Sequence, residues 1–301
     1  MNIASQLPDV AHDCASNIPI DRVGMSGVAL PIELKVDGQT VACAATVSIF
    51  ANVQNDQKGL HMSRMYRTLL DLSSTPLTAS TLEQCARTAL AQQQEVHATE
   101  LSLHVSTLVQ LKRPALHSAG WGWNAYPVEL ALTYSDAQGM RLTQAVTVTY
   151  SSSCPASAAL SRQALSAAFV DHAEAQSEPL STAQVAQWLE QNGTLAIPHS
   201  QRSDAMITID INSAELPVFE VIELSESALE TAVQTYVKRE DEQQFALRNG
   251  ANPMFVEDAS RRLMGALKSA QYSGHVSVTH RESLHGHDAV AHSSFTKGEL
   301  V

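Results

Sequence analysis

The chain has few aromatic residues, few cysteines and no long apolar segment. Aromatic residues make up 5% of its 301 residues, and the longest nearly apolar run, 41–53, still contains Ser, Thr and Asn. Because a membrane-spanning helix needs ~20 apolar residues, we expect no membrane partner. The first sixteen residues contain neither the basic segment nor the apolar core of a secretory signal, which predicts a cytoplasmic protein.

Positive charge is also scarce. Lys and Arg number 19 against 31 Asp and Glu, which gives a formal net charge of -12. A chain of this charge repels phosphate backbones, so we expect no nucleic-acid partner. The four cysteines lie far apart without a CxxC pair, which argues against a disulfide framework and favours small core residues in a reducing compartment.

The hydrophobic pattern of the first half alternates between strand and helix periods. Apolar residues alternate at 32–36 and at 41–49 with Asp37 and Gly38 between them, which predicts an antiparallel hairpin. Helical spacing and then strand alternation follow, with helices expected at 62–72 and 81–94 and strands at 101–105 and 128–134.

The second half repeats this order after a turn at 136–139. The expected elements are a strand at 140–150, helices at 156–169 and 182–191, a strand at 205–211, helices at 218–237 and 254–270, and strands at 276–280 and 288–294. With 156–192 set aside as a helical insertion, the order is ββααββ twice. We therefore expect an N-terminal arm (1–19), a first module (20–138) and a second module (139–301).

This order predicts an α+β fold in which tandem modules form antiparallel sheets with helices on one face. The edge strands of such sheets stay open, and assembly commonly pairs them. We therefore expect a ring-like homo-oligomer with ligand sites between its subunits, and a tetramer as its size.

The densest group of chemically active residues lies near the C-terminus. Four histidines and two carboxylates fall within thirteen residues: His280, Glu282, His285, His287, Asp288 and His292. Carboxylate and imidazole are ligands of divalent cations, and Glu282 and His285 can reach one ion if the chain turns tightly. A solvated polar loop would show the same composition.

Three further residues are candidates by their position. Cys154 follows a strand and precedes Pro155, so its sulfur lies at a helix N-terminus, where a thiolate is favoured; a buried core cysteine is the alternative. His199 precedes a strand and is a candidate acid or base, or a surface histidine. Glu257 occupies a first helical turn, where it can bind the edge of a purine or merely stabilise the helix.

A group of cations surrounds the start of the helix expected at 62–72. Lys58, His61, Arg64 and Arg67 lie within ten residues, which suits a phosphate at a helix N-terminus. An ordinary basic helix face would look similar. Arg202 joins this group as a candidate ligand of a phosphate chain.

Six segments together resemble the GTP cyclohydrolase type IB family of the tunnelling-fold superfamily. In chain order they are DRVGMSGVALPI (21–32), KGLHMSRMYRTL (58–69), SSSCPASAALSRQ (151–163), HSQRS (199–203), NPMFVED (252–258) and ESLHGHDAVA (282–291). The resemblance implies tandem ββααββ modules and hydrolytic opening of the imidazole ring of GTP. The implied products are formate and 7,8-dihydroneopterin triphosphate, which enters folate and pterin synthesis.

The resemblance also implies roles for individual residues. Cys154, Glu282 and His285 would bind a catalytic divalent metal, zinc or manganese, which activates water. His199 would transfer protons, and Glu257 would anchor the guanine. This chain departs from shorter members by a long segment before His199, which leaves His172 as a competing candidate for proton transfer.

Two other functions remain open. A related enzyme could use Cys154 as a covalent nucleophile on a purine-like substrate, as a nitrile reductase does. A module could also bind purine or pterin without catalysis, because fold does not fix function.

Overall fold

The computed structural model describes residues 18–55 and 58–298. Most of the expected N-terminal arm, including Cys14, lies outside these residues. Eight strands form one antiparallel sheet in sequential order. The strands are β1 (Ile20–Val36), β2 (Gln39–Val53), β3 (Leu101–Pro114), β4 (Trp121–Ser135), β5 (Gly139–Ser153), β6 (Ser200–Asp210), β7 (Gly274–His280) and β8 (Ala289–Phe295). The α+β class is confirmed.

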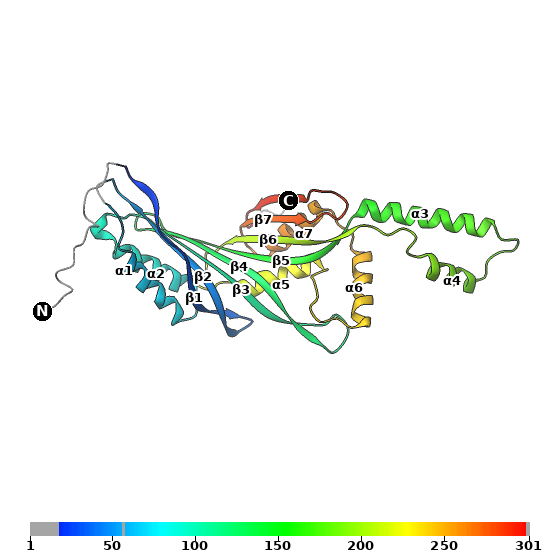
Figure 1. Cartoon of the computed structure of the whole chain (residues 1–301), viewed down its shortest axis with the longest axis horizontal. Coiled ribbons are helices and arrows are strands. Elements are labelled where there is room, and N and C mark those ends of the chain that lie inside the picture. The colour runs from blue at the N-terminus through cyan, green and yellow to red at the C-terminus, as the bar shows by residue number, and fades with distance from the viewer. Residues whose placement is uncertain (1–17, 56–57, 299–301) are drawn as a thin grey trace.

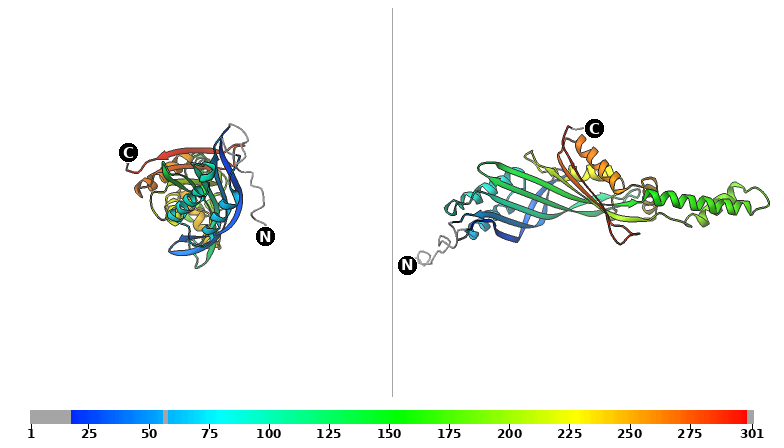
Figure 2. Two further views of the ribbon diagram at one scale, coloured as in Figure 1. Left: turned by 90° about the vertical axis from the view of Figure 1, so that its left-hand side faces the viewer. Right: turned by 90° about the horizontal axis from the view of Figure 1, so that it is seen from above.

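The helices follow the strands in a similar order in each half (Figure 1). They are α1 (Met62–Leu70), α2 (Ala79–Ala91), α3 (Pro155–Glu174), α4 (Thr182–Asn192), α5 (Val218–Leu229), α6 (Arg239–Ala251) and α7 (Val256–Ser269). Seen along the long axis, the sheet curls around the helices (Figure 2). None of the helices in the described ranges is long and apolar enough to cross a membrane.

The hairpin predicted from Asp37 and Gly38 is present. Both residues have positive φ, 49° and 70°, as the commonest two-residue hairpin turn requires. The strands it joins, β1 and β2, keep their register from Ile32 opposite Cys43 to Val36 opposite Gln39. The alternation read from the sequence therefore sends one set of side chains into the core.

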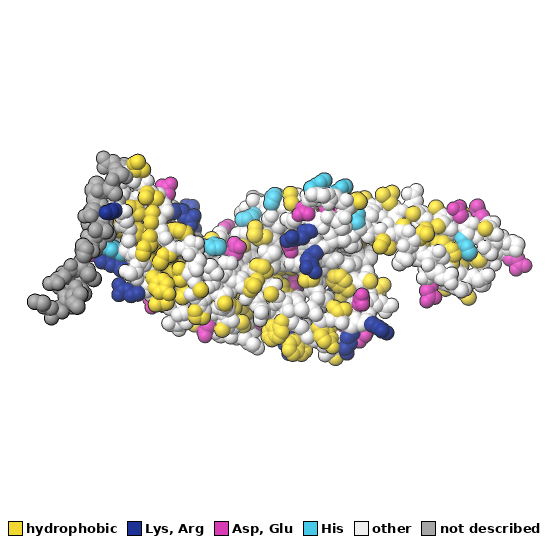
Figure 3. Space-filling view, viewed as in Figure 1, with side chains coloured by type: hydrophobic (Ala, Val, Ile, Leu, Met, Phe, Trp, Pro, Cys, Tyr) yellow, Lys and Arg dark blue, Asp and Glu magenta, His cyan; other side chains and the backbone are white. Residues whose placement is uncertain are grey.

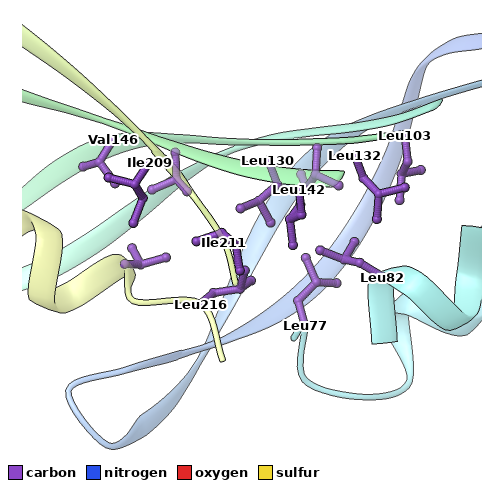
Figure 4. Packing of buried hydrophobic residues seen from close by; sticks show 14 of the residues in the cluster. Leu77, Leu82, Leu103, Leu130, Leu132, Leu142, Val146, Ile209, Ile211 and Leu216 are labelled. Atoms are coloured by element: carbon purple, nitrogen blue, oxygen red, sulfur yellow. The ribbon is translucent and has the colours of Figure 1, made fainter. Parts of the chain in front are cut away.

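One hydrophobic core runs under both halves of the sheet. Leu77 and Leu82 of the first half approach Ile211 and Leu216 of the second, with side chains of β3, β4 and β5 above them (Figure 4). Burying such side chains contributes ~25 cal/mol per Å² of apolar surface. The boundary expected between the two modules, near residue 138, is the turn between β4 and β5, and these strands are neighbours in the same sheet.

The helix expected at 218–237 is wrong in its second half. Helix α5 ends at Leu229, because Glu230 takes a left-handed conformation (φ 66°). The chain then runs beside β5, where the N–H of Ser151 donates to the carbonyl of Thr231 and the N–H of Val233 to that of Thr149, at 2.9 and 3.2 Å. Helix α6 was not predicted either, because its residues are mostly polar and exposed and therefore lack an apolar period.

The segment 156–192 leaves the sheet as a projecting pair of helices, α3 and α4 (Figure 1). Its small core is formed by Trp188, which contacts Phe169 with ring centroids 5.0 Å apart. The pair leaves at the end of β5 and returns at the start of β6. Because these strands are neighbours, the insertion does not separate Ser153 from Ser200, which face each other in the ladder.

Candidate active site

Cys154 and His199 meet where β5 ends and β6 begins. The backbone N–H of Cys154 donates to the carbonyl of His199 at 3.2 Å, and the N–H of His199 donates to Ser157 Oγ at 3.2 Å. The N–H of Ser157 points at Cys154 Sγ, 3.5 Å away, so the sulfur caps α3. The N-terminal dipole of a helix favours negative charge at this position.

The segment after β7 brings a carboxylate to the same place. Glu282 Oε2 lies 3.6 Å from His199 Nδ1 and is buried without a hydrogen bond to any described residue. The rings of His285 and His287 stack nearby, with centroids 5.1 Å apart. Figure 3 shows several histidine side chains gathered along this edge of the molecule. Sequence-distant candidates therefore share one region.

These residues line one cavity of about 350 Å³. Its walls include most of the candidate residues and several neighbours: Cys154, His199, Gln201, Met254, Phe255, Val256, Glu257, His280, Glu282, His285, His287 and Ala289. A cavity of this size suits one small ring system. Its donors are a thiol, imidazoles and carboxylates, and Met254, Val256 and Ala289 add apolar surface.

Glu257 enters the cavity from the first turn of α7. The neighbouring Asp258 performs the capping role, because its Oδ2 accepts from the N–H of Phe255 at 2.9 Å. The helix start is fixed to the site, since the N–H of Met254 donates to the carbonyl of Ser153 at 3.0 Å. The carboxylate of Glu257 is therefore not needed to cap its own helix.

A buried polar network, which the sequence did not predict, lies behind the cavity. Tyr150 Oη lies 2.7 Å from His280 Nε2, and Ser152 Oγ lies 3.3 Å from His280 Nδ1. Ser152 Oγ also lies 2.8 Å from Ser203 Oγ and accepts from Gln201 Nε2 at 3.0 Å. The available signal was polar residues at buried strand positions near 152 and 201–203.

Burial sets the charge state of this network. Desolvation lowers the pKa of His280 to about 4 and raises the pKa of Tyr150 well above its usual value. Both side chains are consequently neutral near pH 7, since a charge in this position would cost several kcal/mol. The network therefore consists of neutral hydrogen-bonding groups.

The cations expected to bind phosphate do not join this cavity within one chain. Arg64 pairs with Glu95 at 3.0 Å, and His61 lies 3.4 Å from the same carboxylate, both beside α1. Lys58 precedes that helix in the chain. Helix α1 lies at the end of the molecule remote from the start of α3 (Figure 1). Arg202 lines two other cavities, of about 830 and 700 Å³.

His172 lies in the projecting helices. Its ring is 5.9 Å from that of Trp188, and it does not line the cavity that holds Cys154. His199, in contrast, lies directly beside Cys154 and Glu282.

The donor set fits a divalent metal by its chemistry. Thiolate, imidazole and carboxylate suit zinc, and the buried Glu282 Oε2 is a polar atom that a cation would satisfy. Within residues 18–55 and 58–298, no three His, Cys, Asp or Glu side chains are gathered closely enough to hold an ion. Binding a metal at Cys154, Glu282 and His285 would thus require side chains to converge.

Two solved structures align over most of the chain. Uricase from Arthrobacter globiformis aligns over 94% of this chain and 96% of its own, with 10% identity and a TM-score of 0.49. A structure of a highly active BTUO mutant aligns over 92% of this chain and 100% of its own, with 9% identity and a TM-score of 0.50. At such identity the second likeness shows the fold alone.

Comparison of sequences identifies the family as well as the fold. The family model described as "Type I GTP cyclohydrolase folE2" matches residues 7–291. GTP cyclohydrolase FolE2 of Serratia proteamaculans is 43% identical, over 96% of this chain and 94% of its own. GTP cyclohydrolase FolE2 of Xanthomonas euvesicatoria is 41% identical, over 96% and 95%. The chain therefore belongs to the type I GTP cyclohydrolase FolE2 family.

Proposed function

We propose that this protein is a GTP cyclohydrolase of folate biosynthesis, active in the cytoplasm. It adds water to the imidazole ring of GTP and releases formate and 7,8-dihydroneopterin 3'-triphosphate. The observation that carries the proposal is the single cavity shared by Cys154, His199, Glu257 and Glu282. Relatives with 41–43% identity over nearly the whole chain carry the name GTP cyclohydrolase.

The metal ligands in this proposal are Cys154, Glu282 and His285. When bound there, zinc or manganese would lower the pKa of a coordinated water and act as a Lewis acid. The sulfur is held in place by the N–H of Ser157, and the carboxylate is buried. Removing any one ligand would therefore weaken metal binding without removing a large part of the core.

The protein's own side chains supply recognition and proton transfer. Glu257 can accept two N–H groups from the edge of guanine, an arrangement that adenine cannot match because its ring nitrogen is an acceptor. His199 lies beside Glu282 and can accept a proton from the attacking water and then donate it to a ring nitrogen as the C–N bond breaks. The apolar side chains of Met254 and Val256 exclude water from one wall.

The triphosphate calls for cations that one chain does not bring to the cavity. We propose that Lys58, His61 and Arg64 of a neighbouring subunit approach it in a head-to-tail homo-oligomer, expected to be a tetramer. Arg202, which lies one residue beyond Gln201 on β6, is a candidate from the same chain. Helix α1, beside which Lys58, His61 and Arg64 lie in the chain, and the start of α3, where Cys154 lies, are at opposite ends of the sheet (Figure 1), which supports a head-to-tail arrangement.

Subunit mixing tests this arrangement. A Cys154→Ala chain and a Lys58→Ala chain should each be inactive alone, and mixed oligomers should regain activity because some sites receive both intact residues. If mixing after reversible dissociation restores nothing while the two chains demonstrably co-assemble, the shared site is wrong.

Formate release from GTP tests the activity itself. Purified protein should release one formate per GTP consumed, lose that activity after chelator treatment and regain it with zinc or manganese. Turnover that is insensitive to the chelator would instead support a covalent role for Cys154. Binding of GTP without any formate would support a non-catalytic module.

A further inference from the structure

Gln201 connects the buried network to the cavity. It is the second residue of β6, it is 9% exposed, and its two amide atoms have different partners. Nε2 donates to Ser152 Oγ at 3.0 Å, and Oε1 lies 3.3 Å from His199 Nδ1. The side chain of Gln201 thus contacts both a hydroxyl of the core and the residue proposed to transfer protons.

The neighbours of His199 Nδ1 determine where the ring carries its proton. Glu282 Oε2, 3.6 Å from this nitrogen, is the oxygen of a carboxylate and can only accept when ionised. A lone pair on Nδ1 would face that oxygen and repel it. The geometry therefore favours a proton on Nδ1 that is donated to Gln201 Oε1, the closer of the two oxygens at 3.3 Å, with Nε2 as the basic nitrogen.

The network behind Gln201 keeps its amide from turning over. If the amide turned, its NH₂ group would face Nδ1 and its oxygen would face Ser152. Ser152 Oγ has further contacts with Ser203 Oγ at 2.8 Å and with His280 Nδ1 at 3.3 Å. Its single proton can serve one of these groups, so it is available to accept from Gln201.

We propose that Gln201 is a positioning residue that holds His199 as the Nδ1–H tautomer and leaves Nε2 unprotonated for the reaction. Gln201 itself does not touch the reacting atoms. Histidine tautomers are selected in this way when a neighbour accepts from one ring nitrogen. The inference deepens the proposed function and rests on it only for the catalytic consequence, because the tautomer is a property of the unliganded protein.

The primary test is ¹⁵N NMR of the histidine rings in metal-free protein. The pH should lie about two units above the ordinary histidine pKa of about 6.5, so that imidazole is neutral. The signal of His199, assigned by its loss in His199→Gln, should show a protonated Nδ1 and an unprotonated Nε2. A protonated Nε2 in the wild-type protein would overturn the proposal, whatever the enzyme does with GTP.

Variants separate positioning from a structural role. Gln201→Leu should shift His199 toward the Nε2–H tautomer and lower kcat about 10- to 100-fold, with KM for GTP changed less than about threefold. Gln201→Glu keeps an acceptor opposite Nδ1 and should retain the tautomer. If Gln201→Leu does not fold, the ¹⁵N spectra of the wild-type protein and of Gln201→Glu still show which ring nitrogen of His199 carries the proton.

Gln144→Leu is the matched control. Gln144 is also buried in the sheet, on β5, but its amide has no hydrogen bond to the described part of the chain and it does not line the cavity. This change should leave the His199 spectrum and kcat unchanged. An equal loss of kcat in both variants, with the His199 tautomer unaltered, would show that Gln201 acts only through general stability and would overturn the proposal.

Discussion

The two halves of the sheet share an order of strands and differ in what their inner faces bury. Among the described residues of β1 to β4, the only buried polar side chain apart from the tyrosines Tyr126 and Tyr134 is Thr107, which donates to the carbonyl of Ala44 at 2.9 Å. Strands β5 to β7 bury several polar side chains: Gln144, Ser152, Ser153, Gln201, Ser203 and His280. The difference cannot come from topology, since both halves are antiparallel with helices on the inner face.

Most of these polar residues lie at one end of β5, β6 and β7, next to the cavity. Burying a polar group costs free energy unless it is hydrogen-bonded, and a cluster is stable only when its members satisfy one another. Ser152, Gln201 and His280 meet this condition. The first half therefore uses its inner face for packing, whereas the second half uses part of that face to support a site.

The largest expected effect comes from replacing a cysteine of the second half, with a cysteine of the first half as the control. Cys154→Ala should lower formate release at least about 1,000-fold, since it removes a metal ligand worth several kcal/mol of transition-state stabilisation. Cys43→Ala, in β2, should leave the rate unchanged. Assays of both variants with matched circular dichroism spectra test this contrast, and comparable activity of Cys154→Ala and the wild type would contradict it.

The next effect concerns the pH dependence of stability. The pKa of His280 is about 4 in the folded protein, below its ordinary value of 6.5. The unfolded chain therefore binds this proton first, and the contribution of neutral His280 is lost as pH falls from 6.5 to 4. The loss should reach about 3 kcal/mol, because each tenfold difference in proton affinity between the folded and unfolded chains corresponds to about 1.4 kcal/mol.

Urea unfolding of metal-free protein measures this effect. The wild-type free energy of unfolding, minus that of His280→Gln, should decrease by that amount between pH 6.5 and 4. A difference that is constant with pH would mean that His280 is not buried as a neutral group.

A smaller effect is expected at the base-binding carboxylate. Glu257→Gln should cost about 2 kcal/mol of transition-state binding, because an amide replaces a charged acceptor. The value of kcat/KM for GTP should then fall about 30-fold and the preference for GTP over ATP should narrow. Glu83→Gln, in α2 of the first half, serves as the control. An unchanged preference would refute the role of Glu257.

The smallest effect is expected at Gln144. Among the buried polar side chains of β5 to β7 named above, it is the one that lies away from the cavity. Neither amide atom of Gln144 has a hydrogen bond within the described chain. Gln144→Leu should therefore raise the free energy of unfolding by about 1–2 kcal/mol, because an unsatisfied amide is removed at similar volume. Thermal or urea unfolding checks this; a loss of stability would indicate that a bound water or a partner satisfies the amide.

The sequence predicts much of this fold because the sheet is regular. Alternation at 32–49 and the turn residues Asp37 and Gly38 define the first hairpin, and Cys154 with Pro155 marks a strand end and a helix start. The pattern failed at α6, whose polar surface has no apolar period, and after Leu229, where the left-handed conformation of Glu230 ends α5. The hydrophobic pattern of a short segment therefore did not predict either the helix α6 or the end of α5.

The site was predicted less completely than the fold. Cys154, His199, Glu257 and Glu282 were candidates by residue type and flanking pattern, and the structure brings them to one cavity. The role of Gln201 depends on the register of β5 with β6, which places Ser152 opposite it. A periodic pattern shows that a residue is buried, but it cannot show which side chain lies across the ladder.

Anomalous diffraction from crystals of the metal-loaded protein tests the central claim most directly. We expect one strong zinc or manganese peak per chain, inside the cavity and within bonding distance of Cys154 Sγ and a carboxylate oxygen of Glu282. A peak elsewhere, or a fully loaded protein whose Cys154 sulfur does not touch the ion, would contradict the proposed metal site.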